Sequence, residues 1–212
     1  YNSEEEKVNA IPDEDYLMLC TNNSYVKKLQ LPKTQNRGGK GISVGKLKED
    51  DYVIKSTILN SRDSIFIFTA EGNVYKFKVY EIPTHTTNNL GTNIKTIINN
   101  ETIISMIPVK DEDIENDSIK IMCATELNRI KLVNMCEFKN VRNNGILFTR
   151  LEEGDRVINV EKIDTEVHDS IIALNTLGNA IRVKIEDIPV SLRPAFGLSL
   201  IHISEPTRHS LI

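Results

Sequence analysis

A short, basic and glycine-rich stretch has the composition of a phosphate-binding loop: Gln35-Asn36-Arg37-Gly38-Gly39-Lys40-Gly41. Glycine has no Cβ, so the backbone can approach a ligand closely, and the arginine and lysine supply positive charge. Lysines extend this charge on both sides of the stretch, and no carboxylate intervenes before Glu49: Lys27, Lys28, Lys33, Lys46 and Lys48. Both a phosphate contact and an ordinary solvated turn would have this composition.

Two familiar phosphate-binding motifs do not fit this stretch. A P-loop has the pattern G-x-x-x-x-G-K-[ST] and leads into a helix, whereas Ile42 follows Gly41 in this chain and no helical periodicity follows. The dinucleotide-binding pattern G-x-G-x-x-G is also absent. Neither motif therefore assigns a nucleotide to the loop, and its partner must be inferred from the elements around it.

The composition indicates a folded domain with a local rather than a general positive charge. The 212 residues are 40% hydrophobic and carry a net charge of −4, which allows a sizeable core and argues against a uniformly basic surface. No apolar run approaches the roughly 20 residues that span a bilayer, and the acidic first 15 residues do not resemble a signal peptide. The chain starts with tyrosine, so we expect a fragment of a longer protein.

The cysteines and histidines predict neither a disulfide framework nor a metal site. The cysteines are odd in number, lie in or next to apolar runs and form no C-x-x-C motif, which favours buried thiols in a reducing cytosol. The four histidines do not pair at the spacing of zinc ligands. These residues are Cys20, Cys123 and Cys136, and His85, His168, His202 and His209.

Four similar units follow one another along the chain, about 50 residues apart, which is close to the period of a propeller blade. Each unit opens with a short apolar run: 16–20, 65–68, 119–123 and 171–174. Asp-Ser-Ile introduces the last three of these runs. A turn residue follows each run: Ser24, Gly72, Leu127 and Gly178. The fourth residue after each turn residue is basic: Lys28, Lys76, Lys131 and Arg182.

The segments that carry these cations alternate between apolar and polar residues, as 74–79 and 180–185 show. This alternation predicts half-buried strands, with the cations of all four units on one solvent-facing outer face. Three of the units also have a glycine and, ten residues later, an acidic residue that opens another strand: Gly41 and Asp51, Gly91 and Glu101, and Gly145 and Asp155. The pattern predicts an all-β fold of four-stranded, propeller-like blades with almost no helix.

The repeat resembles the C-terminal domain of the A protein of bacterial DNA gyrase, whose diagnostic gyrase A box is Q-R-R-G-G-[RK]-G. Gln35, Arg37, Gly38, Gly39, Lys40 and Gly41 match the box, and Asn36 stands where the family usually has a second arginine. The resemblance covers roughly residues 11–197 and implies a β-pinwheel, a propeller-like ring whose blades exchange strands. We place the blades at about 13–62, 63–116, 117–168 and, in part, 169–197, after the end of a linker at 1–12.

The resemblance implies that the domain binds and wraps duplex DNA without reading its sequence, and that the box gives the wrap its positive handedness. Strand passage then introduces negative supercoils. It assigns DNA contacts to the box and to Lys27, Lys28, Lys76, Lys131 and Arg182. It further implies a cytoplasmic, nucleoid-associated enzyme with two A and two B subunits. The ATP and Mg²⁺ that the whole enzyme needs belong to parts outside this chain, for which we expect no catalytic, cofactor or metal residues.

Two other functions remain open from the sequence. The corresponding protein of topoisomerase IV has similar repeats and separates linked DNA circles, although it typically lacks an intact box. A protein-interaction propeller without DNA binding belongs to a different class. The last segment, 198–212, breaks the repeat and resembles the translation of a transposase adapter used in sequencing libraries, so we interpret it as a non-native tail.

Overall fold

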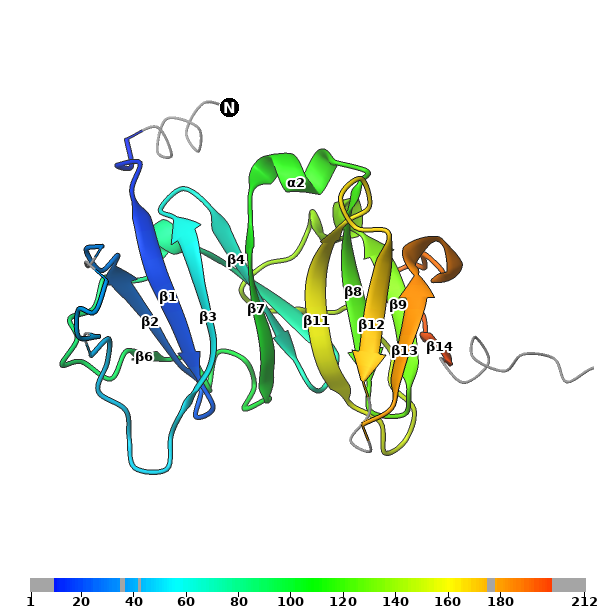
Figure 1. Ribbon diagram of the computed structural model, residues 1–212, viewed down its shortest axis with the longest axis horizontal. Helices are drawn as coiled ribbons and strands as arrows, with labels where there is room; N and C mark the ends of the chain where they lie inside the picture. Colours follow the sequence, from blue (N-terminus) through cyan, green and yellow to red (C-terminus); the bar gives the residue numbers. More distant parts are fainter. Residues whose placement is uncertain (1–9, 35–36, 42, 175–177, 200–212) are drawn as a thin grey trace, which may run out of the picture.

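Antiparallel β-sheets make up nearly all of the regular structure in this computed structural model, which describes residues 10–34, 37–41, 43–174 and 178–199. Within these residues, three sheets have four strands each and a fourth sheet has two. Each sheet is one blade, and Figure 1 shows blades 1, 2 and 3 from left to right, with the β12–β13 hairpin of blade 4 overlapping blade 3 in this view. The predicted all-β fold with four-stranded blades is therefore confirmed.

The strands of each four-stranded blade lie across the sheet in an order that differs from their order in the chain. Blade 1 contains β3 (Val53–Asn60), β1 (Asp15–Thr21), β2 (Tyr25–Gln30) and β6 (Thr92–Asn93). Blade 2 contains β10 (Ile146–Leu147), β5 (Asn73–Lys78), β4 (Ser64–Thr69) and β7 (Ile103–Val109). Blade 3 contains β11 (Val157–Asp164), β8 (Ile119–Thr125), β9 (Arg129–Asn134) and β14 (Leu198–Ser199). Blade 4 contains β12 (Ser170–Leu174) and β13 (Ala180–Lys184).

The inner side of the fold is formed by β3, β7 and β11, with β7 packed between the other two (Figure 1). The opposite, outer edge of each four-stranded sheet carries β6, β10 or β14. We call this edge, together with the loops that enter and leave these three strands, the rim. The helical segments that the structure describes are short: α2 (Asp111–Glu115), η1 (Val79–Glu81), η2 (Met135–Phe138) and η3 (Ile185–Asp187). None of the described helices is long and apolar enough to cross a membrane.

Every outer strand is lent by the following repeat. The strands β6, β10 and β14 pair with β2, β5 and β9, although each comes later in the chain than the hairpin of the next blade. A glycine precedes each lent strand: Gly91, Gly145 or Gly197. A Cβ at Gly91 would lie 2.6 Å from the carbonyl oxygen of Val26, so only glycine lets the lent strand approach this closely. The strand exchange that the resemblance implied is confirmed.

The blades pack face to face through apolar side chains. All six residues of β4 are buried, because neighbouring blades cover both of its faces. Between blades 2 and 3, the Phe68 ring meets the rings of Phe66, Phe138 and Phe148 with centroids 6.2, 6.0 and 4.9 Å apart. Edge-to-face packing of this kind adds to the hydrophobic burial that holds the blades together.

The turn inside each hairpin requires a residue with positive φ, and this corrects one predicted register. The residues in this position are Ser24, Gly72, Asn128 and Gly178, with φ of 63°, 87°, 59° and 83°. In the third repeat the turn residue is thus Asn128 and not Leu127, because asparagine tolerates the left-handed region far better than leucine. Lys131 consequently aligns with Lys27 and not with Lys28.

The structure also revises two smaller expectations. Cys20 and Cys123 are buried as predicted, and burial raises the pKa of both thiols to about 12. Cys136 is exposed, because Met135 and Phe138 take the buried positions of the turn η2. The predicted break of the repeat at 198 is also wrong for its first two residues, since β14 completes blade 3. Residues 200–212 of the predicted tail lie outside the described residues.

Candidate functional site

The gyrase A box lies in the loop between β2 and β3, at the end of the molecule farthest from the β12–β13 hairpin (Figure 1). Its described residues, 37–41, are all exposed. Gly38 has a φ of +87°, and a Cβ built on it would meet nothing within 4 Å. Glycine at this position therefore serves the backbone conformation and not the packing. Gln35 and Asn36 lie outside the described residues.

Exposed cations surround the described part of the box. Lys33, Lys46 and Lys48 are exposed, as are Arg37 and Lys40 within the box. The ion pairs found among the described residues involve none of these five side chains. Lys48 lies 5.0 Å from the centre of the Tyr25 ring, and the hydrogen bond between their side chains lowers the pKa of the Tyr25 hydroxyl. The box loop thus presents five exposed cations for which the described residues show no ion pair.

Lys28 was predicted to face solvent, and this prediction is wrong. Its neighbour Lys27, predicted to contact DNA, is also buried. Lys27 and Lys28 are only 3% and 4% exposed. The Lys27 Nζ lies 3.4 Å from the carbonyl oxygen of Thr87, and the Lys28 Nζ donates to the carbonyl oxygen of Val79 at 3.0 Å. Burial lowers the pKa of both amines.

Lys131 of blade 3 is also buried, with 1% of its surface exposed. Its Nζ donates to three backbone carbonyl oxygens, those of Phe148 at 3.0 Å, Arg193 at 2.6 Å and Ala195 at 2.7 Å. Burial lowers the pKa of this amine to about 8. Backbone from the following repeat covers these lysines: the segments that precede the lent strands β6 and β14 lie against Lys27 and Lys131, and the turn η1 lies against Lys28.

The remaining two repeated cations do not form a continuous basic surface either. Lys76 is half-buried, and its Nζ lies 5.9 Å from the centre of the Phe66 ring. Arg182 is exposed but contacts Asp169 at 3.5 Å and the hydroxyl of Ser170 at 2.8 Å. Of the four cations predicted to share an outer face, only Arg182 reaches solvent fully, and a carboxylate partly neutralises it.

Another series of cations was missed by the sequence analysis and lies on the rim. Lys95 follows β6 by two residues, and Arg150 follows β10 by three. Both are exposed, as is Arg142 in the loop that enters β10. A signal for two of them was present, because each repeat glycine is followed four or five residues later by a cation: Gly41 by Lys46, Gly91 by Lys95 and Gly145 by Arg150.

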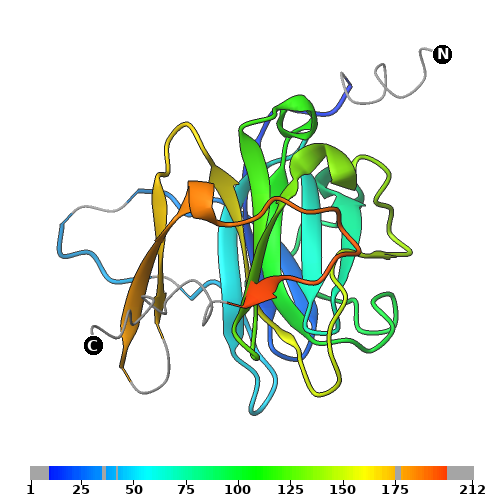
Figure 2. The ribbon, with the colours of Figure 1, turned by 90° about the vertical axis from the view of Figure 1, so that its right-hand side faces the viewer.

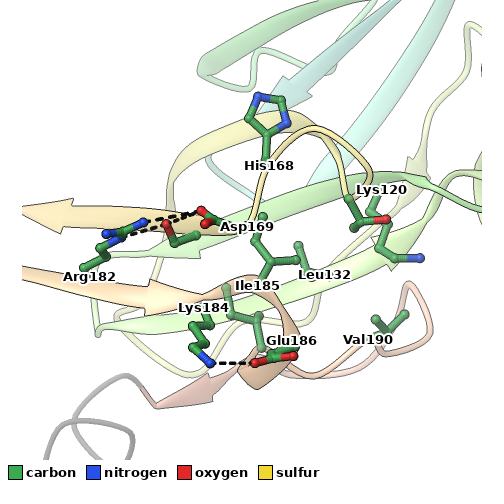
Figure 3. Close-up of a pocket in the computed structure, with 12 residues that line it drawn as sticks. Lys120, Leu132, His168, Asp169, Arg182, Lys184, Ile185, Glu186 and Val190 are labelled. Atoms are coloured by element: carbon green, nitrogen blue, oxygen red, sulfur yellow. Dashed lines mark hydrogen bonds and ion pairs between the residues drawn. The ribbon is translucent and has the colours of Figure 1, made fainter.

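A cavity of about 790 Å³ opens between blades 3 and 4 (Figure 3). Leu132, Ile185 and Val190 form part of its apolar wall. Four of the charged side chains that line it pair with one another, Arg182 with Asp169 at 3.5 Å and Lys184 with Glu186 at 2.9 Å. Lys120, which also lines it, donates to Asn134 Oδ1 at 2.7 Å. The cavity therefore offers no set of charges that converges on one ligand. Among the described residues, moreover, no group of three or more His, Cys, Asp or Glu side chains could hold a metal ion.

The loop and the rim belong to a repeat that matches a known family. The model of the family described as DNA gyrase C-terminal domain, beta-propeller, matches residues 15–60, 63–110, 120–164 and 169–206. The gyrase A protein of Salmonella typhimurium is 28% identical over 199 residues, and that of Clostridium acetobutylicum is 32% identical over 193 residues. These alignments cover 92% and 89% of this chain but 22% and 23% of the two relatives, so the chain spans less than a quarter of their length.

Solved structures show the same architecture. The structure of a DNA gyrase A C-terminal domain has a TM-score of 0.67 at 25% identity, with 88% of this chain and 60% of that chain covered. The crystal structure of the C-terminal domain of DNA topoisomerase IV has a TM-score of 0.71 at 23% identity, with 89% and 57% covered. This second likeness shows a shared fold and does not distinguish between the two enzymes.

Proposed function

Because the chain belongs to the family of DNA gyrase C-terminal domains, we propose that it binds duplex DNA along its rim and wraps it as part of a gyrase A protein. The observation that carries this proposal is the box loop, whose exposed cations have no carboxylate partner among the described ion pairs. Phosphates of duplex DNA lie about 1.7 Å apart along the helix axis, so such cations gain affinity by releasing counterions. This part of the affinity does not depend on base sequence.

The rim supplies the repetition that wrapping needs. Bending a few tens of base pairs through 40 to 90° costs of order 1 to 6 kcal/mol, so contacts must recur along the bent path. Lys46, Lys95 and Arg150 stand at similar places in three successive repeats, each shortly after the repeat glycine. They replace the buried Lys27, Lys28 and Lys131 as the proposed phosphate contacts outside the box, and Lys76 and Arg182 contribute less.

The helical content supports binding without base recognition. A helix that reads the major groove needs several turns and side chains that donate to base edges. The only α-helix in the described residues, α2, has five residues, four of them acidic. It would repel the DNA backbone and is too short to enter a groove as a recognition helix.

The same proposal assigns the chain to a larger enzyme. We infer that the chain works in a complex of two A and two B subunits on bacterial DNA in the cytoplasm, where ATP and Mg²⁺ act in other parts of the enzyme. The box favours gyrase over topoisomerase IV, and the protein-interaction propeller is the alternative that a lack of DNA binding would support.

Measuring DNA binding over a salt series tests the proposal. The 212-residue chain is mixed with linear duplexes of unrelated sequence, and the mobility shift is recorded at increasing salt. We expect the affinity to be equal for all sequences and to fall as the salt concentration rises. A plot of the logarithm of the affinity against the logarithm of the salt concentration should have a slope of about −0.9 for each phosphate contact. The absence of binding at low salt would refute DNA wrapping by this chain.

A matched pair of double variants locates the contact. Arg37→Ala with Lys40→Ala removes two cations from the box. Lys110→Ala with Lys184→Ala removes two exposed cations that already pair with Glu112 and Glu186. The first pair should weaken binding and reduce the salt slope by about two, whereas the second should leave both unchanged. Equal losses in both would mean that only the net charge matters.

A further inference from the structure

We propose that Lys27 and Lys131 are positioning residues whose buried ammonium groups hold the rim segments in place without touching DNA. The positioning itself is a property of the free protein. Its consequence for DNA binding rests on the proposed function. Both lysines stand in the same place of their blades, because Lys27 pairs with Leu19 and Lys131 with Cys123 at equivalent steps of the two hairpins.

Lys131 lies where the third and fourth repeats meet. Its β9 strand belongs to blade 3, and its first partner, the Phe148 carbonyl, directly follows the strand that this repeat lends to blade 2. Its other two partners, the Arg193 and Ala195 carbonyls, precede β14, the strand that the fourth repeat lends to blade 3. One ammonium group thus joins the outgoing and the incoming rim segments.

Arg193 strengthens the same junction. Its Nη1 donates to the carbonyl oxygen of Leu147 in β10 at 2.8 Å. Arg150 follows β10 by three residues, so the segment that these bonds fix carries one of the proposed phosphate contacts. The buried lysine therefore acts on DNA binding through the position of another side chain.

Lys27 occupies the corresponding junction of blade 1, next to the box loop. Thr87 precedes Gly91 by four residues, as Arg193 precedes Gly197, and its carbonyl oxygen accepts from the Lys27 Nζ at 3.4 Å. The same oxygen accepts the backbone N–H of Lys46 at 3.0 Å. A Cβ at Gly45 would lie 2.7 Å from the Lys27 Nζ, so the lysine also lies against the end of the box loop.

A lysine suits this place because an ammonium group has three donors and no acceptor, and backbone carbonyls converge on it. A buried carbonyl that loses its donor costs free energy, so a neutral apolar side chain of the same length cannot replace the lysine without loss. Blade 2 has Tyr75 at the equivalent step, opposite Ile67. Its ring packs against Gly145 and its hydroxyl oxygen accepts from Asn99 Nδ2 at 3.2 Å, so the tyrosine fills the junction by other means.

Hydrogen exchange of the DNA-free chain tests the positioning directly, with two variants that control each other. In Lys27→Met we expect the amide of Lys46 to exchange about five- to tenfold faster, while the β14 amides keep their protection. In Lys131→Met we expect the reverse, faster exchange around β14 and normal protection at Lys46. Lys33→Met, a change of an exposed lysine in the same loop, should alter neither.

Three outcomes overturn the proposal. The first is unchanged protection of Lys46 in Lys27→Met. The second is an equal loss of protection throughout the chain, which would show a general loss of stability. The third is a salt slope of DNA binding that falls by about 0.9 in Lys27→Met with normal exchange, which would make Lys27 a direct phosphate contact.

Lys27 makes one such bond where Lys131 makes three, so Lys27→Met keeps the proposal testable even if Lys131→Met does not fold. Exchange is measured without DNA. A failure of DNA binding in the unmodified chain would therefore refute the proposed function and leave the positioning result standing.

Discussion

The Nζ of Lys131 lies 2.6 Å from the carbonyl oxygen of Arg193, a residue of the following repeat. A side chain that the alternation of its strand assigns to solvent thus connects two blades. The connection is possible because each repeat lends its outer strand to the blade before it, and Figure 2 shows the lent strand β14, in red, beside the green strands of blade 3. The segment before β14 supplies the Arg193 and Ala195 carbonyls that the lysine binds. In the account proposed above, the charge of Lys131 stabilises the strand exchange, and other, exposed cations contact DNA.

The pH dependence of stability should report the burial of Lys131. Burial lowers the pKa of its amine to about 8 from the usual 10.5. Between these two values the unfolded chain holds a proton that the folded chain has released, so this group makes the free energy of unfolding rise with pH. In the folded chain the neighbouring Cys123 thiol has a pKa of about 12, above this range.

Urea unfolding of the chain and of Lys131→Met between pH 7 and pH 10.5 measures this effect. We expect the stability difference between them to shift in favour of lysine as pH rises from about 8 to about 10.5. A difference that stays constant over this range would contradict the lowered pKa. Lys139→Met, which removes an exposed lysine, should show no such shift.

A methyl group at Gly145 should destabilise the junction of blades 2 and 3. Gly145 has a φ of +76°, and a Cβ there would overlap the ring of Tyr75, which is 1% exposed and cannot move aside. Gly154 has a φ of +80°, but a Cβ there would meet nothing within 4 Å. Both alanine variants lose about 1 to 2 kcal/mol to the left-handed backbone, and Gly145→Ala should lose about 1 to 3 kcal/mol more. Thermal or urea unfolding compares the two, and equal losses would show that the lent strand tolerates the added methyl.

The whole enzyme should need the box for negative supercoiling but not for relaxation of supercoiled DNA. Arg37→Ala with Lys40→Ala, made in the full-length gyrase A protein and assembled with gyrase B, should abolish ATP-dependent negative supercoiling. Relaxation of supercoiled DNA should persist, because strand passage does not require the wrap. Supercoiling at the unmodified rate would remove the box from the mechanism, and loss of both activities would indicate misassembly.

The fold was predictable because the pattern repeats. The apolar runs, the Asp-Ser-Ile openers and the repeat glycines recur at nearly constant spacing, which makes a blade architecture the simplest interpretation. In the third repeat, residue spacing alone gave the wrong register. Counting from Leu127 instead of Asn128 aligned Lys131 with Lys28, whereas the structure aligns it with Lys27. The φ of 59° at Asn128 decides the register, and a backbone angle is not visible in the residue spacing.

The site was only partly predictable, since the exposure of a side chain depends on which backbone covers it. Alternation places Lys28 on the outer face of β2, but segments from the next repeat lie over it, and Lys28 donates to the Val79 carbonyl. Lys27 and Lys131 are buried for the same reason. The exposure of the box could be predicted without the strand exchange, because a glycine-rich loop outside the sheets remains exposed wherever the blades lie.

The wrapping of DNA can be measured most directly by closing a nicked circular plasmid with ligase in the presence of the chain. If the rim wraps DNA, the topoisomer distribution shifts with increasing ratio of chain to plasmid, in the positive direction that the gyrase A family implies. The shift should disappear in Arg37→Ala with Lys40→Ala and persist in Lys110→Ala with Lys184→Ala. An unshifted distribution on plasmid that a mobility shift shows to be fully bound would contradict wrapping by this chain.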